Sequence, residues 1–196
     1  IHTATAARVF GVSPKKVTID QRSQAKMVSY GLAYGMEAYG LSQRLSIGVD
    51  EATHILEAYF TAFPSVKAYM DTTVSDARRN GYTETLFGRR RPIPELRSDN
   101  FRIRQAGERQ AMNAGIQGLA ADIFKIALVR IDRALAERSL ASRLVLQVHD
   151  EVIVESPSNE KPVVEELVID IMRSAAELNV PLEVNFSWGS SWAAAK

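Results

Sequence analysis

Two adjacent carboxylates, Asp150 and Glu151, lie between two short apolar runs, Arg143 to Val148 and Val152 to Glu155. Both runs are rich in Val, Leu and Ile, which predicts two strands joined by a tight hairpin with His149 at its tip. Tight hairpins usually turn on Asn-Gly or another Gly-containing pair, because those residues tolerate a positive φ. Carboxylates held on a rigid element suit Mg²⁺, so this tip is a candidate metal site. The alternative is a charged hairpin tip that contacts only water.

A second candidate is the segment from Asp20 to Gly35, which reads DQRSQAKMVSYGLAYG. On a helix, Arg22 and Lys26 lie one turn apart, and Tyr30 flanks the face that they form. Such a face can hold a phosphate, with Arg as a fork and Lys as a point charge, while Tyr30 lies beside a sugar. An exposed basic face without a ligand is the alternative interpretation.

A polar stripe is the third candidate. Arg109, Asn113 and Gln117 follow at intervals of four, which places them on one face of a helix. Such a row can reach base edges and sugars in a minor groove, whose acceptors are similar for all base pairs. It can equally be a solvated helix face. The run Arg89 to Arg91 is either a soluble turn or a contact to phosphate, and the position of His2 alone assigns it no role.

Composition limits the class of protein. With 196 residues, 46% of them hydrophobic, the chain can bury a sizeable core, and its net charge of +1 does not by itself indicate a nucleic-acid or membrane partner. The absence of Cys excludes disulfides and thiolate metal sites. No apolar run approaches the roughly 20 residues of a membrane-spanning helix, and no signal segment opens the chain. These features favour a cytoplasmic protein, and the start at Ile1 without Met suggests a processed or excised fragment.

Helical periodicity dominates the first two thirds of the chain, and turns that contain Gly or Pro interrupt it. We expect Asp50 to cap a helix that runs through Phe63, and a second helix to run from Pro64 to Asn80. The segment from Gly81 to Leu96 predicts a small surface hairpin that turns at Gly88.

The rest of the chain combines helices with strands. We expect a long helix from Asp99 to Arg138 with a break near Gly115 to Gly118, and a further amphipathic helix from Asn159 to Leu178. Pro181 to Trp188 alternates apolar and polar residues like a closing strand. The fold class is therefore α+β and predominantly α, with a short antiparallel sheet in the second part. The change near residue 100 is the only candidate subdomain boundary, between 1–100 and 101–196.

Taken together and in this order, these segments resemble the family A DNA polymerases of the bacterial DNA polymerase I type over essentially all 196 residues. The pattern Arg-x-x-x-Lys-x-x-x-Tyr-Gly-x-x-Tyr-Gly, which begins at Arg22, is similar to the fingers-helix signature of that family. Gln-Val-His-Asp-Glu at residues 147–151 is similar to its last palm motif. The segments at residues 2–6, 85–91 and 113–118 also look like family segments.

The resemblance implies a nucleotide site. His2, Arg22 and Lys26 would bind the triphosphate of the incoming deoxynucleotide, and Lys26 would also be catalytic. Tyr30 would lie beside the sugar, and Tyr34 would lie by the templating base. Relatives with Tyr instead of Phe at the position of Tyr30 are associated with accepting chain-terminating dideoxynucleotides.

The resemblance also implies a metal and DNA site. Asp150 would ligate catalytic Mg²⁺, with two ions in the complete enzyme, and Glu151 would act nearby. His149 would touch the primer end of the primer-template DNA. Arg109, Asn113 and Gln117 would contact the duplex next to the growing primer end. The reaction would be two-metal phosphoryl transfer by a DNA-directed DNA polymerase in replication and repair.

The match implies a helical fingers subdomain over 1–100 and the C-terminal part of a palm over 101–196. The family's other metal-binding aspartate lies in a motif of the pattern Asp-Tyr-Ser-x-Ile-Glu, which no segment here resembles, so we expect it upstream of Ile1. The chain alone would then be inactive and would need an upstream polymerase portion. The protein would be cytoplasmic and associated with the nucleoid. The alternatives are a non-catalytic nucleotide- or nucleic-acid-binding fragment, one half of a split polymerase, or an unrelated helical scaffold.

Overall fold

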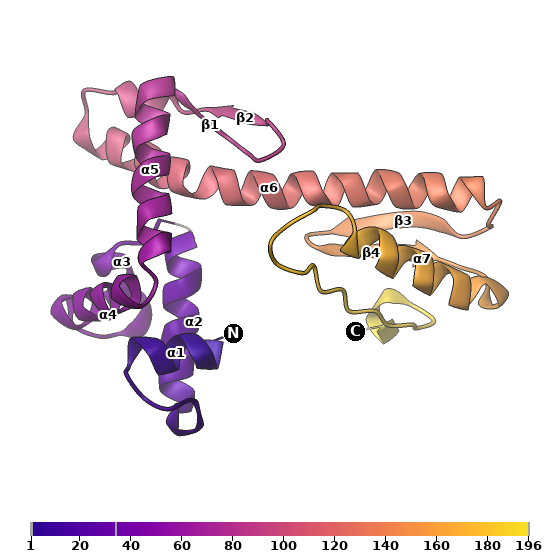
Figure 1. Ribbon diagram of the computed structural model, residues 1–196, viewed down its shortest axis with the longest axis horizontal. Helices are drawn as coiled ribbons and strands as arrows, with labels where there is room; N and C mark the ends of the chain where they lie inside the picture. Colours follow the sequence, from indigo (N-terminus) through magenta and orange to yellow (C-terminus); the bar gives the residue numbers. More distant parts are fainter. Residues whose placement is uncertain (1, 34, 196) are drawn as a thin grey trace. The chain divides into compact units, whose positions relative to one another are not determined.

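The computed structural model describes residues 2–33 and 35–195, which form two compact units, 1–118 and 119–196. Figure 1 shows the helices and strands of each unit. Among the described residues, the first contains five α-helices, two short 3-10 helices, one hairpin and the N-terminal part of a sixth α-helix. The second contains the rest of that helix, a second hairpin and a further α-helix. The fold class is confirmed as α+β and predominantly α, with two small antiparallel sheets.

The first unit begins with four helices whose apolar faces share one core. They are α1 (His2–Val9), α2 (Ile19–Ala33), α3 (Ala38–Leu45) and α4 (Val49–Ala62). Val28 and Leu41 are about 1% exposed, and Ile55 and Tyr59 of α4 complete the centre of this core. On α2 the buried residues Ala25, Val28 and Leu32 define the inner face, so the other face of that helix is presented to solvent.

The predicted helix from Pro64 to Asn80 is confirmed as α5 (Pro64–Asn80). Pro64 occupies the first turn, where its missing N–H is not needed, and Gly81 ends the helix in a left-handed conformation with φ 80°. The preceding helix, α4, begins one residue before Asp50, because Gly48 is its N-cap and Asp50 lies in the first turn. The expected cap at Asp50 is therefore wrong by two residues, although a carboxylate there still complements the helix dipole.

The first hairpin is also confirmed. It pairs β1 (Tyr82–Glu84) with β2 (Arg90–Pro92), and Gly88 supplies the positive φ of 81° that the turn requires. A short 3-10 helix, η2 (Pro94–Arg97), follows the hairpin. Ile93 and Leu96 then pack with Val74 and Ala77 of α5 and with Ala111 in a second small core.

Helix α6 (Phe101–Glu137) is unbroken over 37 residues, so the expected break near Gly115 to Gly118 is wrong. These glycines serve packing instead. A Cβ at Gly118 would lie 2.6 Å from Thr85 Cγ2, and one at Gly115 would lie 2.8 Å from the Tyr69 hydroxyl. The glycines let two neighbouring elements approach the helix closely without ending it.

The second unit packs the β3–β4 hairpin and α7 (Lys161–Arg173) against the C-terminal part of α6. The hairpin joins β3 (Arg143–Val148) to β4 (Glu151–Glu155) in antiparallel register, as predicted. Its core is formed by residues from α6 and α7, namely Ile131, Leu135, Val164, Leu167 and Val168.

Two expectations for the end of the chain are corrected. The expected helix from Asn159 to Leu178 is shorter, because α7 begins at Lys161 after a 3-10 turn and ends at Arg173. The expected strand from Pro181 to Trp188 has no strand assignment and no ladder partner among the described residues. Its side chains do alternate between exposed and half-buried, and Phe186 and Trp188 pack on the third core. Within the described ranges, no helix is long and apolar enough to cross a membrane.

Glu160 holds the turn that leads from α6 into β3. Its carboxylate accepts hydrogen bonds from the backbone N–H groups of Ala141 and Ser142, both at 2.9 Å, and from the Ser142 hydroxyl at 2.5 Å. Ser142 is 5% exposed, so its buried backbone N–H would lose its hydrogen-bond partner without the carboxylate. The Ser142 hydroxyl and the Ala141 N–H hold the pKa of Glu160 below its usual range.

The lowered pKa predicts acid-dependent stability of the second unit. A depressed carboxyl pKa contributes stability that is complete above the ordinary glutamate pKa of about 4.3 and is lost as the pH falls through the lowered value. Glu160→Gln should therefore lower the urea midpoint at pH 7 and flatten its decline between pH 5 and pH 3. Glu166→Gln, at an exposed position of α7, is the control. Equal midpoints for Glu160→Gln and Glu166→Gln at pH 7 would contradict the assignment.

Candidate functional site

A reciprocal pair of hydrogen bonds fixes the start of α2, the helix with the basic face. The Gln21 N–H donates to Thr18 Oγ1 and the Thr18 N–H donates to Gln21 Oε1, both at 3.1 Å. This arrangement is a capping box, in which two groups without helical partners satisfy each other. It sets the phase of the helix, and therefore the direction in which Arg22 and Lys26 project.

The structure brings three of the expected nucleotide-binding residues together. The His2 ring, on α1, lies 5.6 Å from the Tyr30 ring, and Lys26 Nζ lies 5.8 Å from the centroid of the same ring. Tyr30 is 51% exposed, so one side of this stack is open to solvent. The fifth expected residue, Tyr34, lies outside the described residues.

His2 is the electrostatically unusual member of this cluster. Its Nδ1 is buried and has no hydrogen-bond partner within the described part of the chain. Burial lowers the pKa of His2, and the nearby positive charges of Lys26 and Arg22 lower it further. The ring is therefore biased toward its neutral form until a negative charge approaches.

Arg22 and Lys26 carry the positive charge of the exposed face. Both side chains are accessible to solvent, and neither forms an ion pair with a carboxylate among residues 2–33 and 35–195. Arg22 lies near the N-terminus of α2, where the helix dipole is already positive. This arrangement is unfavourable for the isolated helix and favourable for binding an anion.

The end of α2 is pressed against α6. Gly35 has φ 67°, and a Cβ there would lie 2.9 Å from both Cβ and Cγ of Arg109. Glu37, just beyond, accepts from Gln105 Nε2 at 3.1 Å and lies 4.0 Å from the Arg109 guanidinium. Arg109, the first residue of the polar stripe, is thus placed directly by the turn that ends the basic helix.

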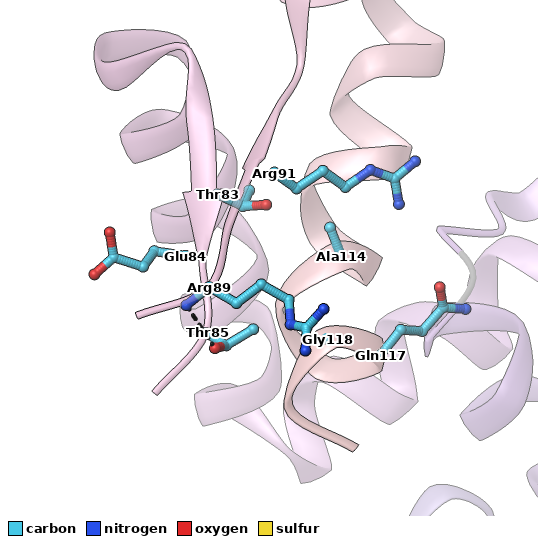
Figure 2. Close-up of a pocket in the computed structure, with 8 residues that line it drawn as sticks. All are labelled: Thr83, Glu84, Thr85, Arg89, Arg91, Ala114, Gln117 and Gly118. Carbon is cyan, nitrogen blue, oxygen red and sulfur yellow. Dashed lines mark hydrogen bonds between the residues drawn. The ribbon is translucent and has the colours of Figure 1, made fainter. Parts of the chain in front are cut away.

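The stripe continues along α6 beside the first hairpin. Arg109 and Asn113 are half-buried, and Gln117 is exposed. Gln117 lines a pocket of about 180 Å³ between the hairpin and α6. Figure 2 shows Arg89 and Arg91 extending from the hairpin toward the helix that carries Ala114, Gln117 and Gly118.

The tip of the second hairpin, in the other unit, is a two-residue turn of His149 and Asp150. His149 adopts φ 53°, in the left-handed region where glycine is usual, and the Gln147 side chain donates to its carbonyl at 2.9 Å. Asp150 and Glu151 are both exposed there. They are oxygen donors of the kind that Mg²⁺ prefers, so their chemistry fits such an ion. The described residues contain no group of three or more His, Cys, Asp or Glu that could hold a metal.

Two functional candidates were missed from the sequence. Glu37 contacts the stripe through Gln105 and Arg109, and Trp192 donates its indole N–H to Glu151 at 3.2 Å. Neither lies on a periodic face shared with the residues that it contacts. Only the three-dimensional structure brings these pairs together.

Comparison with known proteins identifies the family. Residues 1–194 match the model of DNA polymerase family A. The chain belongs to this family.

Its relatives include bacterial DNA polymerase I proteins. Over the whole chain it is 51% identical to DNA polymerase I of Mycobacterium tuberculosis H37Rv and 50% identical to that of Bacillus subtilis strain 168. The chain spans 22% of the length of each of these relatives. It also resembles the solved POL domain of Pol1 from M. smegmatis in complex with DNA primer-template and dNTP, with a TM-score of 0.94 and 47% identity. That match covers 99% of this chain and 34% of the other.

The contact between Gly35 and Arg109 predicts that alanine substitution lowers the free energy of unfolding more at Gly35 than at Gly11. Gly11 has φ 63°, but a Cβ added there would meet nothing within 4 Å, so Gly11→Ala should cost only about 1 kcal/mol of backbone strain. Gly35→Ala should cost about 1–3 kcal/mol more, because the new methyl overlaps Arg109. Urea denaturation followed by far-UV circular dichroism measures both. Equal losses of unfolding free energy in Gly11→Ala and Gly35→Ala would show that the close contact with Arg109 does not require glycine at position 35.

Proposed function

We propose that this chain carries the nucleotide-binding helix and part of the metal-binding site of a DNA-directed DNA polymerase. The complete enzyme would add deoxynucleotides to a primer 3′ end by two-metal phosphoryl transfer. The observation that carries this proposal is the cluster of His2, Lys26 and Tyr30, with a second cation, Arg22, on the same helix. Family membership and the relative solved with primer-template and dNTP support the same substrates.

The α2 face can bind a triphosphate by charge and by hydrogen bonding. Arg22 offers a fork of N–H donors and Lys26 a point charge, one helical turn apart. Approach of a polyphosphate would favour protonation of His2, whose pKa is lowered by the neighbouring cations. His2 and Lys26 flank Tyr30, so Tyr30 would lie beside the sugar of a nucleotide whose phosphates these residues bind.

The hairpin tip would hold catalytic Mg²⁺ through Asp150, with Glu151 beside it. When bound, two such ions in the complete enzyme would activate the primer 3′-hydroxyl and stabilise the pyrophosphate leaving group. The chain's own contribution at this place is to carry the two carboxylates on adjacent residues, at the two-residue turn that joins β3 to β4. The His149 side chain, in the same turn, would contact the primer end.

Arg109, Asn113 and Gln117 would follow the duplex next to the growing end. Their donors and acceptors lie along one row of α6 and can reach minor-groove acceptors that differ little between base pairs. Such contacts suit an enzyme that copies any template, because template pairing supplies the sequence specificity. Arg89 and Arg91, on the adjacent hairpin, add positive charge beside Gln117.

The division into a fingers subdomain, 1–100, and part of a palm, 101–196, is also a proposal. Residues 1–118 and 119–196 form the compact units, and α6 runs from the first into the second. On this assignment the N-terminal part of α6 packs with the fingers while belonging to the palm segment. The helix would then couple the nucleotide-binding part to the metal-binding part.

We further propose that the chain alone does not extend primers. Two-metal chemistry needs several oxygen ligands, and the described residues contain no group of three or more His, Cys, Asp or Glu that could hold a metal ion. A misplaced reacting phosphate costs about 10²-fold in rate. A further polymerase segment, with its own carboxylate, would complete the site.

A complementation assay tests this proposal. Primer extension with Mg²⁺ would be measured for the chain alone, for the chain mixed with the preceding portion of a related family A polymerase, and for the same mixture with Asp150→Ala. We expect extension only in the unsubstituted mixture, with Asp150→Ala lowering the rate at least about 10²-fold. Extension by the chain alone would contradict the missing-ligand argument.

A mixture that assembles but does not extend primers would instead favour a second function, a non-catalytic nucleotide- or nucleic-acid-binding fragment. The observation that favours this alternative is that each compact unit has an apolar core of its own. A split polymerase, in which a partner chain supplies the missing part, would give activity in the mixture. The assay therefore separates the two.

Tyr30 predicts the selectivity of the complemented enzyme. Its hydroxyl can replace the hydrogen bond that a dideoxynucleotide loses with its 3′-OH, so discrimination against dideoxynucleotides should be weak. Tyr30→Phe should lower the dideoxy-to-deoxy incorporation ratio by roughly two- to tenfold, because one hydrogen bond is worth about 0.5–1.5 kcal/mol. Single-nucleotide incorporation assays measure the ratio. An unchanged ratio would rule out this role for the hydroxyl.

A further inference from the structure

The C-terminal turn of the chain reaches the hairpin that carries the candidate metal ligands. Within the second unit, η4 (Trp192–Ala195) places Trp192 so that its indole Nε1 donates to Glu151 Oε2 at 3.2 Å. The two residues are 41 positions apart in the sequence, so no local pattern produces this contact. Trp192 is 41% exposed, which leaves the hydrogen bond near the surface, close to Asp150 in the chain.

The turn is itself anchored. The Ser187 hydroxyl donates to the Ala195 carbonyl, and a Cβ at Gly189 would lie 2.5 Å from the Ala195 backbone nitrogen. Gly189 therefore permits a backbone-to-backbone approach that no other residue allows. The turn is held against the segment that precedes it, and Trp192 is held with it.

That preceding segment is fixed to α7. The Trp188 indole donates to Glu165 at 2.8 Å, and its ring lies 5.2 Å from the Phe186 ring and 5.1 Å from Lys161 Nζ. Phe186 and Trp188 both pack on the core of the second unit. A continuous set of contacts thus runs from this core through residues 186–195 to the Glu151 carboxylate.

Glu151 is an exposed glutamate at the first position of β4, and such a side chain ordinarily samples many rotamers. A hydrogen bond from an indole to one carboxylate oxygen restricts that freedom and leaves the other oxygen available. We propose that Trp192 is a positioning residue that holds the Glu151 carboxylate beside Asp150, so that the C-terminal turn belongs to the metal-binding apparatus. This inference rests on the proposed function, since it assigns a role toward the metal of that site.

The chain contains a matched internal control. It has two tryptophans, and each donates its indole N–H to a glutamate: Trp192 to Glu151, and Trp188 to Glu165. The two indole signals of the ¹⁵N-labelled chain are assigned with Trp188→Phe and Trp192→Phe. Glu151→Ala should shift the Trp192 signal alone, and Glu165→Ala should shift the Trp188 signal. A Trp192 signal that does not respond to Glu151→Ala would overturn the proposal.

The consequence for metal binding is measured without enzyme activity. Mn²⁺, a paramagnetic probe, would be titrated while the imidazole proton signals of His149, at the same tip, are followed. Trp192→Phe should raise the Mn²⁺ concentration for half-broadening by about tenfold, as loss of an outer partner does at other metal sites. In a Glu151→Ala background, Trp192→Phe should have no further effect, because a positioning residue acts only through the group that it holds.

The outcomes separate this proposal from the function on which it rests. If Mn²⁺ broadens His149 equally in the unsubstituted chain and in Trp192→Phe, the metal site stands and the positioning role is wrong. The role is also wrong if Trp192→Phe weakens Mn²⁺ binding equally with and without Glu151, since Trp192 would then be merely structural. If the unsubstituted chain shows no Mn²⁺ effect at His149, either alone or when mixed with the preceding portion of a related family A polymerase, the metal role of the hairpin fails and the positioning role fails with it.

Discussion

The contact between Gly35 and Arg109 determines the geometry of the first unit's functional face. A helix can project cations in any direction, and only its packing against a second element decides what those cations lie beside. Gly35 turns the chain with a positive φ and lets backbone touch the side-chain stem of Arg109, while Glu37 contacts Gln105 and Arg109 just beyond. The C-terminal end of α2, the helix with the basic face, is thereby held against Arg109, the first residue of the polar stripe on α6.

Helix α6 accepts close neighbours at several points along its first half, and glycine is the means each time. Gly107 faces the backbone at Glu95 and Leu96, Gly115 faces Tyr69, and Gly118 faces Thr85. Glycine inside a helix costs about 1 kcal/mol each relative to alanine. Three such residues in one helix therefore require a compensating gain in packing energy. That gain comes from η2, α5 and the first hairpin, which pack directly on the helix backbone. The helix continues through these glycines, which permit close packing and do not end it.

Much of the fold followed from local signals, because the residues that begin and end these elements act locally. Pro64 and Gly81 bounded α5 correctly, and Gly88 marked the first hairpin. The motif residues of α2 also lay on one face, as their spacing predicted. The break in α6 was wrong because the same residue type either ends a helix or accommodates a neighbour, and the sequence does not show the neighbour. Glu37 and Trp192 were missed for the same reason, since their importance lies in contacts with residues remote in sequence.

The segment from Pro181 to Trp188 shows what an alternating pattern does and does not establish. Its burial alternates residue by residue, as expected of one face on a core, yet it pairs with no strand in the described part of the chain. Alternation is a property of side chains, whereas a strand needs backbone partners. Here Phe186 and Trp188 pack on the core, and the Trp188 indole donates a hydrogen bond to Glu165, so side-chain contacts hold the segment. This packing is sufficient to place the C-terminal turn beside Glu151. A segment without strand pairing can therefore position Trp192 as a sheet strand would.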